Sequence, residues 1–311
     1  MQLIVILLAT VSILTFLSGA IVLFGSSKGD RVRSIWYFLA AIFATSWMAS
    51  IATFLIASPN SNDNIYWHVN WTFISAMLLD VAFLGYGAWR KKYGKLTTFV
   101  FLIFALVLSG EILFIPNSLY SDVILANTGN SVVMNMDHFY SSYIAFFSFI
   151  VPVIIVTFFY QFIKSRSKRK REGDIITMAS FGISSGVVLV FNLILPLFNN
   201  WSLIWLGPIA LAITILGIYY TILRYRMLNL SSVWLRIFSY IVVIASIAII
   251  YMVIFSIIFA ALFRGSTPSI EVIILNFIMI LIFIGFMPAM NGFIKFIKTL
   301  IVNPNKGQEE E

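Results

Sequence analysis

Unbroken runs of about twenty apolar residues dominate the chain, and short polar segments separate them. A run of this length is what an α-helix needs to cross about 30 Å of hydrocarbon. A soluble α/β domain would interrupt such runs with amphipathic alternation. The pattern therefore predicts an all-α, polytopic bundle of about nine transmembrane helices. The predicted spans are residues 2–24, 35–56, 67–89, 96–115, 141–164, 175–198, 203–223, 237–263 and 271–294.

Basic residues are concentrated in alternate gaps between these spans. Of the 20 Lys and Arg residues, 19 lie in the odd-to-even gaps or after the ninth span, and Arg264 alone falls on the other side. Because Lys and Arg are retained in cytoplasmic loops, this distribution predicts an external N-terminus and a cytoplasmic C-terminus in a plasma membrane. The first span has no basic segment before it, so we expect a retained helix rather than a cleaved signal peptide.

The composition agrees with a membrane protein and limits its chemistry. The chain is 61% hydrophobic and 10% charged, against about 25% charged residues in an average globular domain. The net charge of +8 is explained by the topology and by contact with membrane lipid, rather than by nucleic acid. Cysteine is absent, no Lys lies inside a predicted span, and His68 and His138 are both at the external boundary. We therefore expect no catalytic residue, no metal and no cofactor.

Two acidic residues, Asp80 and Glu111, lie well inside predicted spans. A charge in hydrocarbon costs about 2.5 kcal/mol or more, so such residues deserve a functional hypothesis. Helical spacing places Asp80 with Asn70, Phe73, Met77 and Gly87 on a face that we expect to point inward. Interhelical hydrogen bonding is the plainest interpretation of Asp80, with ligand contact, a protonation-linked switch and an ion path as alternatives. For Glu111, snorkelling or a helix-end contact competes with pocket lining.

The sixth predicted span contains the sequence GISSG, from Gly182 to Gly186. It matches the G-x-S-x-G of a nucleophile elbow, but that motif needs a strand-to-helix turn and a histidine base. It also matches G-x-x-x-G, which needs only close helix packing, and we predict that Gly182 and Gly186 serve packing. Asn192 and Pro196 follow on the same face, which favours a helix kinked around an outward-facing cavity.

Aromatic residues gather at the external ends of the third, sixth and seventh spans, as Tyr66, Trp67, Trp71, Trp201 and Trp205. Interfacial anchoring explains them without a specific function, and an aromatic-lined pocket is the alternative. The candidate ligand-binding residues are therefore Trp67, Trp71, Asp80, Glu111, Asn192 and Trp205.

Residues 116–140 form the longest external segment, in which turn residues surround two short apolar patches. We expect a small hairpin or lid over the outer surface there.

The seventh span ends in a recognisable pattern. Gly207-Pro208 stand near its outer end, Tyr219-Tyr220 precede its exit, and the segment Arg224–Asn229 reads RYRMLN. This resembles the closing helix of the seven-helix sensor region at the N-terminus of many bacterial histidine kinases, with Met in place of Leu and Asn in place of Asp. The resemblance covers roughly residues 1–230, and it implies sensing of an external or membrane-dissolved ligand. Arg224, Arg226 and Arg236 are the candidate residues for transmitting the signal inward.

Three parts follow from this comparison: a sensor-like domain of residues 1–230, a two-helix membrane hairpin of 231–294, and a short cytoplasmic tail of 295–311. The tail is too short for a phosphoacceptor helix pair and an ATP-binding domain. We therefore expect a sensor or receptor-like module that signals to a separate kinase or other cytoplasmic partner, or one cut from a longer protein. A small-solute transporter or channel, and a non-catalytic subunit of a membrane complex, remain the alternatives.

Overall fold

The computed structural model describes residues 2–26, 30–57, 65–88, 92–115, 118–125, 130–134, 138–165, 167–198 and 200–225. All of them belong to one compact unit, Met1–Ser246. The predicted eighth and ninth spans, the tail, Arg226 and Arg236 lie outside the described residues.

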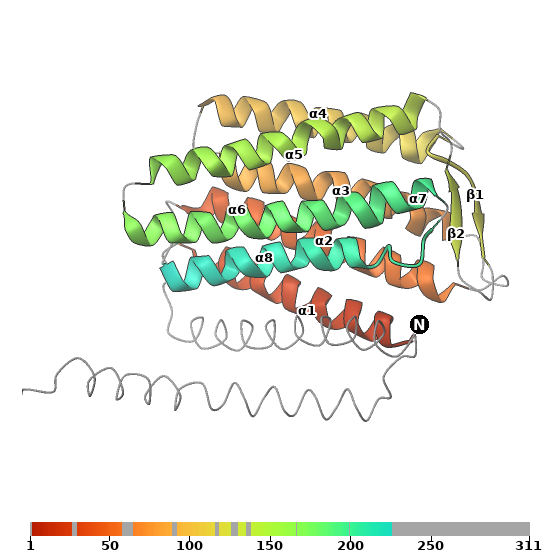
Figure 1. Ribbon diagram of the computed structural model, residues 1–311, viewed down its shortest axis with the longest axis horizontal. Coiled ribbons are helices and arrows are strands. Elements are labelled where there is room, and N and C mark those ends of the chain that lie inside the picture. The colour runs from red at the N-terminus through yellow and green to blue at the C-terminus, as the bar shows by residue number, and fades with distance from the viewer. Residues whose placement is uncertain are drawn as a thin grey trace, which may run out of the picture. The chain divides into compact units, whose positions relative to one another are not determined.

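The described part of the chain is an all-α bundle with one small β-hairpin (Figure 1). Seven of its helical segments are long and apolar enough to cross a membrane. Each corresponds to one of the first seven predicted spans. The elements are α1 Gln2–Gly25, α2 Arg31–Ile56, α3 Ile65–Ala88, α4 Lys92–Phe114, α5 His138–Lys164, α6 Lys168–Val188, the π-helix η2 Leu189–Ile194, α7 Leu195–Leu197 and α8 Leu206–Tyr225.

The main differences in helix limits are at the start of α6, which lies seven residues before the predicted start at 175, and at the starts of α2 and α4, which lie four residues before the predicted starts at 35 and 96. The added turns contain Arg31 and Arg33 in α2, and Lys92 and Lys95 in α4. Arg and Lys are good helix formers, so these helices continue beyond their apolar runs.

Helices α3 and α8 are the most buried of the seven. Helix α3 contacts α2, α4 and α5, while α8 contacts α1, α2 and α6 and so closes the bundle. On the predicted inward face of α3, Phe73, Met77 and Asp80 are buried, and Asn70 and Gly87 are half-buried.

Polar side chains join helices deep in the bundle. The hydroxyl of Tyr37 on α2 donates to the carbonyl oxygen of Ile215 on α8 at 2.9 Å and lies 3.1 Å from the Ser18 hydroxyl on α1. Between α6 and α8, Ser184 donates to the Ala210 carbonyl at 2.6 Å and Thr214 to the Ser180 carbonyl at 3.1 Å. In a membrane, where apolar packing gains little over contact with lipid, such bonds add to the association of helices.

Consecutive long helices run in opposite directions (Figure 1), so their basic ends meet at one end of the bundle. Arg31 opens α2, Lys92 opens α4, Lys164 closes α5 and Lys168 follows at the start of α6. Arg224 is in the last turn of α8. The β-hairpin lies at the opposite end.

The hairpin pairs β1 Tyr120–Ile124 antiparallel with β2 Ser131–Met134, and its register is irregular between Tyr120 and Asp122. This confirms the hairpin predicted within residues 116–140. The Asn130 amide donates to the carbonyl oxygens of Phe54 at 2.6 Å and Ala57 at 2.9 Å, at the C-terminal end of α2. The Tyr120 hydroxyl donates to Asn70 Oδ1 on α3 at 2.7 Å. The hairpin is thereby fastened to both helices.

Candidate ligand cavity

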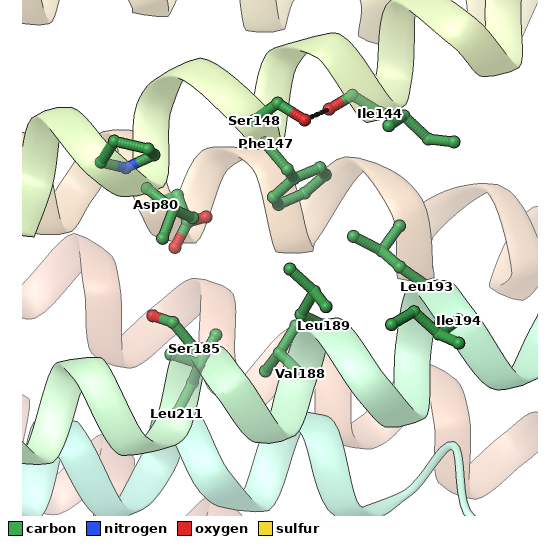
Figure 2. Close-up of a pocket in the computed structure, with 12 residues that line it drawn as sticks. Asp80, Ile144, Phe147, Ser148, Ser185, Val188, Leu189, Leu193, Ile194 and Leu211 are labelled. Atoms are coloured by element: carbon green, nitrogen blue, oxygen red, sulfur yellow. Dashed lines mark hydrogen bonds between the residues drawn. The ribbon is translucent and has the colours of Figure 1, made fainter.

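A cavity of about 470 Å³ lies between α3, α5, α6, η2 and α8 (Figure 2). Its wall is mostly aliphatic and aromatic, with three polar side chains. The polar residues are Asp80, Ser148 and Ser185, and the apolar ones are Ile144, Phe147, Val151, Pro152, Val188, Leu189, Leu193, Ile194 and Leu211.

Two of the three polar side chains have no partner among the residues that the structure describes. Asp80 is only 3% exposed, and none of the described residues gives its carboxyl group a hydrogen bond or an ion pair. The Ser185 Oγ is also buried without a hydrogen-bond partner. The Ser148 hydroxyl, by contrast, donates to the Ile144 carbonyl of its own helix at 2.9 Å. Figure 2 shows Asp80 and Ser185 reaching into the cavity from opposite sides.

The interhelical hydrogen bond that we expected for Asp80 is therefore not found among the described residues. Burying a polar group costs free energy unless a partner compensates it. Asp80 and Ser185 accordingly leave hydrogen-bonding capacity available in an otherwise apolar space.

Four residues of the cavity wall, Ser148 and Pro152 of α5 and Leu189 and Ile194 of η2, border what we call the lateral gap. All four are exposed, Leu189 at 49% and Ile194 at 39%. They lie within the candidate membrane spans Tyr140–Lys164 and Lys170–Ile194. In the described part of the chain, the gap therefore lies at the depth of the candidate membrane spans rather than at either end of the bundle.

The π-helix η2 has a local cause. The backbone N–H of Leu195 donates to the carbonyl oxygen of Val190, five residues earlier. Pro196 has no N–H to donate to the Asn192 carbonyl, as an α-helix would require. The turn before it is therefore free to widen, and such π-turns are frequent at functional sites. The wider turn supplies three residues of the cavity wall, Leu189, Leu193 and Ile194, whereas Asn192 and Pro196, which were predicted to share the cavity face, do not line it.

Asn192 itself faces away from the cavity wall and joins η2 to α8. Its Nδ2 donates to the Ile204 carbonyl at 3.0 Å, and its Oδ1 is buried without a hydrogen-bond partner. A Cβ on Gly207 would overlap the Asn192 amide. Glycine at 207 is thus what allows η2 and the start of α8 to approach so closely.

The other four candidate ligand-binding residues also lie outside this cavity. Trp67 and Trp71 stack on each other with ring centroids 5.9 Å apart, and the Trp71 Nε1 donates to the Ser46 hydroxyl. Glu111 lines a separate void of about 10 Å³. Trp205 is buried. Of the six candidates, Asp80 alone lines the cavity, so the structure does not bring the predicted set together.

The aromatic residues at the outer helix ends divide into two groups. Tyr66 and Trp67 are exposed, at 44% and 54%, as interfacial anchors would be. Trp201 and Trp205 are buried, so anchoring does not describe them. Trp201 contacts Phe54 edge-on instead, with ring centroids 6.5 Å apart.

None of the described residues packs closely against Gly182 or Gly186, so their packing role stays a prediction. Both are exposed, and a Cβ built on either meets no atom within 4 Å. The packing face of α6 is the one that carries Ser180 and Ser184, which bond to α8. At 100° per residue the glycines, two positions further along, point to the opposite side.

Sequence reasoning missed Ser185 and the α5 side of the cavity. Ser185 lies within the GISSG segment, whose interpretation as a packing motif rests on its two glycines and assigns no role to this serine. On α5, Ser148 and Pro152 are four residues apart, so they share one helix face. A hydroxyl and a proline on one face of a long apolar helix were the available signal.

No group of three or more His, Cys, Asp or Glu side chains that could hold a metal occurs among the residues that the structure describes. No model of a known protein family matches the chain, and no curated protein matches it. The fold and the cavity define the class: a multi-pass helical membrane protein, by the length and apolar character of its helices, with a ligand-sized cavity among them.

Proposed function

We propose that the protein is a membrane sensor or receptor-like module that binds a small, membrane-dissolved ligand in the Asp80 cavity and signals to a separate cytoplasmic partner. The observation that carries this proposal is the cavity of about 470 Å³ with an unpartnered carboxyl group in its wall. Ligand pockets typically measure about 300–1,000 Å³ and combine apolar walls with a few polar groups. No catalytic step belongs to this function.

The proposed orientation places the basic end of the bundle in the cytoplasm of a bacterial cell, because cytoplasmic loops are rich in Lys and Arg. The N-terminus and the hairpin are then external. The resemblance of residues 205–229 to the closing helix of kinase sensor regions supports the same direction of signalling. Arg224, at the end of α8, is then at the inner face, and the connection towards Arg236 carries the signal onward.

A chain of contacts on the cytoplasmic side of Asp80 supports coupling to α8. Tyr86 lies on α3, six residues after Asp80, and its ring centroid is 6.0 Å from that of Tyr37. The Arg33 guanidinium lies 4.1 Å from the Tyr86 ring centroid. Tyr37 in turn bonds to Ile215 of α8. A ligand that displaces α3 would change this contact set, and a signal requires such differential contact.

Photolabelling tests the binding step. The full chain, in phosphatidylcholine nanodiscs, is exposed to a dodecanol that carries a diazirine, and adducts are mapped by peptide mass spectrometry. We expect adducts enriched at cavity residues such as Phe147 and Leu193. Ser185→Trp, which fills the cavity, should remove the enrichment, while the lipid-facing Ile183→Trp should keep it. Adducts spread evenly over the lipid-facing surface would refute the cavity as a ligand site.

Spin-label distances test the signalling step, and the absence of native cysteine makes labelling selective. Ile163→Cys on α5 and Tyr220→Cys on α8 are both exposed near the inner ends of their helices. We expect a bound ligand to change the distance distribution between the two labels. An unchanged distribution under conditions where the cavity is photolabelled would rule out sensing through α8.

A small-solute transporter or channel is the second candidate, because an unpaired acid inside a span is also typical of a transport path. Solute flux into proteoliposomes that is lost in Asp80→Asn would favour it over sensing. Stable co-purification with a membrane partner, without photolabelling of the cavity, would instead favour a non-catalytic subunit.

A further inference from the structure

We propose that the cavity selects an amphiphilic amine, whose ammonium group lies between Asp80 and Ser185 and whose alkyl chain runs along the apolar wall. This inference rests on the proposed function, since it names the ligand class of the same cavity. It adds a route: the ligand arrives from the bilayer through the lateral gap.

The charge balance of the cavity indicates a cation. Asp80 is buried, no Lys or Arg lines the cavity, and no described residue compensates the carboxyl group. An isolated carboxylate in a low-dielectric environment is costly, and a nearby opposite charge removes that cost. An ammonium ligand supplies the missing charge.

The hydrogen-bonding capacity of the cavity indicates a donor. An ionised carboxylate only accepts hydrogen bonds, and a serine hydroxyl can accept as well as donate. A primary ammonium group brings three donors, enough for Asp80 and for the Ser185 Oγ, which has no partner of its own. An alcohol brings one donor and no charge, and a fatty acid brings a charge of the same sign as Asp80.

The rest of the wall suits an alkyl chain. Phe147, Val188 and Leu193 line the cavity with hydrocarbon and offer no hydrogen bonds from their side chains. Figure 2 shows these residues between the Asp80–Ser185 end and Ile194, with Ser148 beside Phe147, so the two polar side chains that lack a partner among the described residues lie at one end of the wall. The ligand is therefore expected to have one polar end and one apolar end.

The lateral gap fits a ligand that is already dissolved in lipid. Ser148 and Pro152 on one side and Leu189 and Ile194 on the other are exposed within candidate spans. An amphiphile that partitions into the bilayer reaches this gap by diffusing in the membrane plane. No aqueous path to Asp80 is needed.

Competition against the diazirine-dodecanol probe tests the ligand class. Dodecylamine, dodecan-1-ol and dodecanoate are compared at pH 7.5 in nanodiscs of zwitterionic phosphatidylcholine, so that lipid charge does not concentrate the amine. We expect dodecylamine to displace the probe at a concentration at least tenfold below that of dodecan-1-ol, with dodecanoate the weakest. Asp80→Asn, which keeps the shape of the side chain, should abolish the tenfold preference while the probe still labels the cavity.

The control is Asp122→Asn, which removes one exposed carboxylate from the hairpin and should leave the preference intact. Equal displacement by all three compounds, or an amine preference that survives in Asp80→Asn, would overturn the amine assignment and leave the cavity as a ligand site. A cavity that no compound protects and no probe labels would overturn the proposed function itself.

The route has its own test. Leu189→Trp narrows the lateral gap and should slow the rate of probe labelling at least severalfold, while Ile183→Trp, exposed on α6 away from the cavity, should not. Equal rates in both variants would show that the ligand does not pass between α5 and η2.

Discussion

The side-chain amide of Asn192 lies against the Cα of Gly207 and donates a 3.0 Å hydrogen bond to the carbonyl oxygen of Ile204. One contact thus holds the π-helix to the start of α8. Because η2 forms part of the cavity wall, the geometry of the cavity depends on a residue that does not line it.

Gly207→Ala should destabilise the protein by about 1–3 kcal/mol, the usual cost of overpacking a filled interior, because the added Cβ overlaps the Asn192 amide. Reversible unfolding in mixed micelles measures this loss. The matched control is Gly182→Ala, where a Cβ meets open space and alanine is the better helix former. If both variants are equally stable, the close approach is not a constraint on the fold.

Tyr37→Phe should cost about 1 kcal/mol, between the average of about 0.6 kcal/mol and the maximum of about 1.7 kcal/mol measured for hydrogen bonds between membrane helices. The variant removes the hydroxyl that joins α2 to Ile215 of α8 and to Ser18 of α1. The same unfolding experiment measures it, with the exposed Tyr93→Phe as control. A loss no larger than that of the control would mean that this bond contributes nothing to helix association.

Asn130→Ala should loosen the hairpin, because the amide bonds to two carbonyl oxygens at the end of α2. We expect amide hydrogen exchange to rise in β1 and β2 and to remain unchanged in α3. Asn200→Ala removes an exposed side chain whose hydrogen bonds among the described residues are to Ser202 alone, and it serves as the control. Unaltered exchange in the hairpin would show that the α2 contact does not hold it.

Tyr120 should make stability fall at alkaline pH. Burial, and secondarily the nearby Tyr66, raises the pKa of the Tyr120 phenol above its ordinary value. The unfolded chain, with a tyrosine pKa of about 10, then loses this proton first. The stability that the protonated Tyr120 phenol gives the folded state is fully present well below about pH 10 and declines as the pH rises above it. The stability difference between wild type and Tyr120→Phe, measured from pH 8 to pH 11, should be flat and then shrink. A constant difference across that range would contradict the prediction.

The seven described spans were predictable because a hydrophobic run of membrane length has few alternatives. The inward position of Asp80 was predictable for a similar reason, since helical spacing places it with Phe73 and Met77. Packing partners were not predictable in this way. Ser180 and Ser184 have the same four-residue spacing as Gly182 and Gly186, and only the tertiary structure decides which pair faces α8.

The cavity was only partly predictable. Asp80 was marked by its charge, and Pro196 marked a disturbance in the sixth span. Beside Ser148 and Pro152, the α5 wall contains Ile144, Phe147 and Val151, which are ordinary residues for a lipid-facing helix. They line a cavity because the helices around them leave a space there, and not because of their own chemistry. A single sequence does not show where helices leave such a space.

The π-helix before Pro196 has a consequence for sequence comparison. The bond from the Leu195 N–H to the Val190 carbonyl joins residues five apart, whereas each bond of an α-helix joins residues four apart. The π-helix therefore holds one extra residue. In a related chain with a regular α-helix here, equivalent positions on the two sides of η2 would be one residue closer in sequence. An alignment without a gap between residues 189 and 194 would therefore assign one half of the helix to the wrong face, by about 100° of rotation.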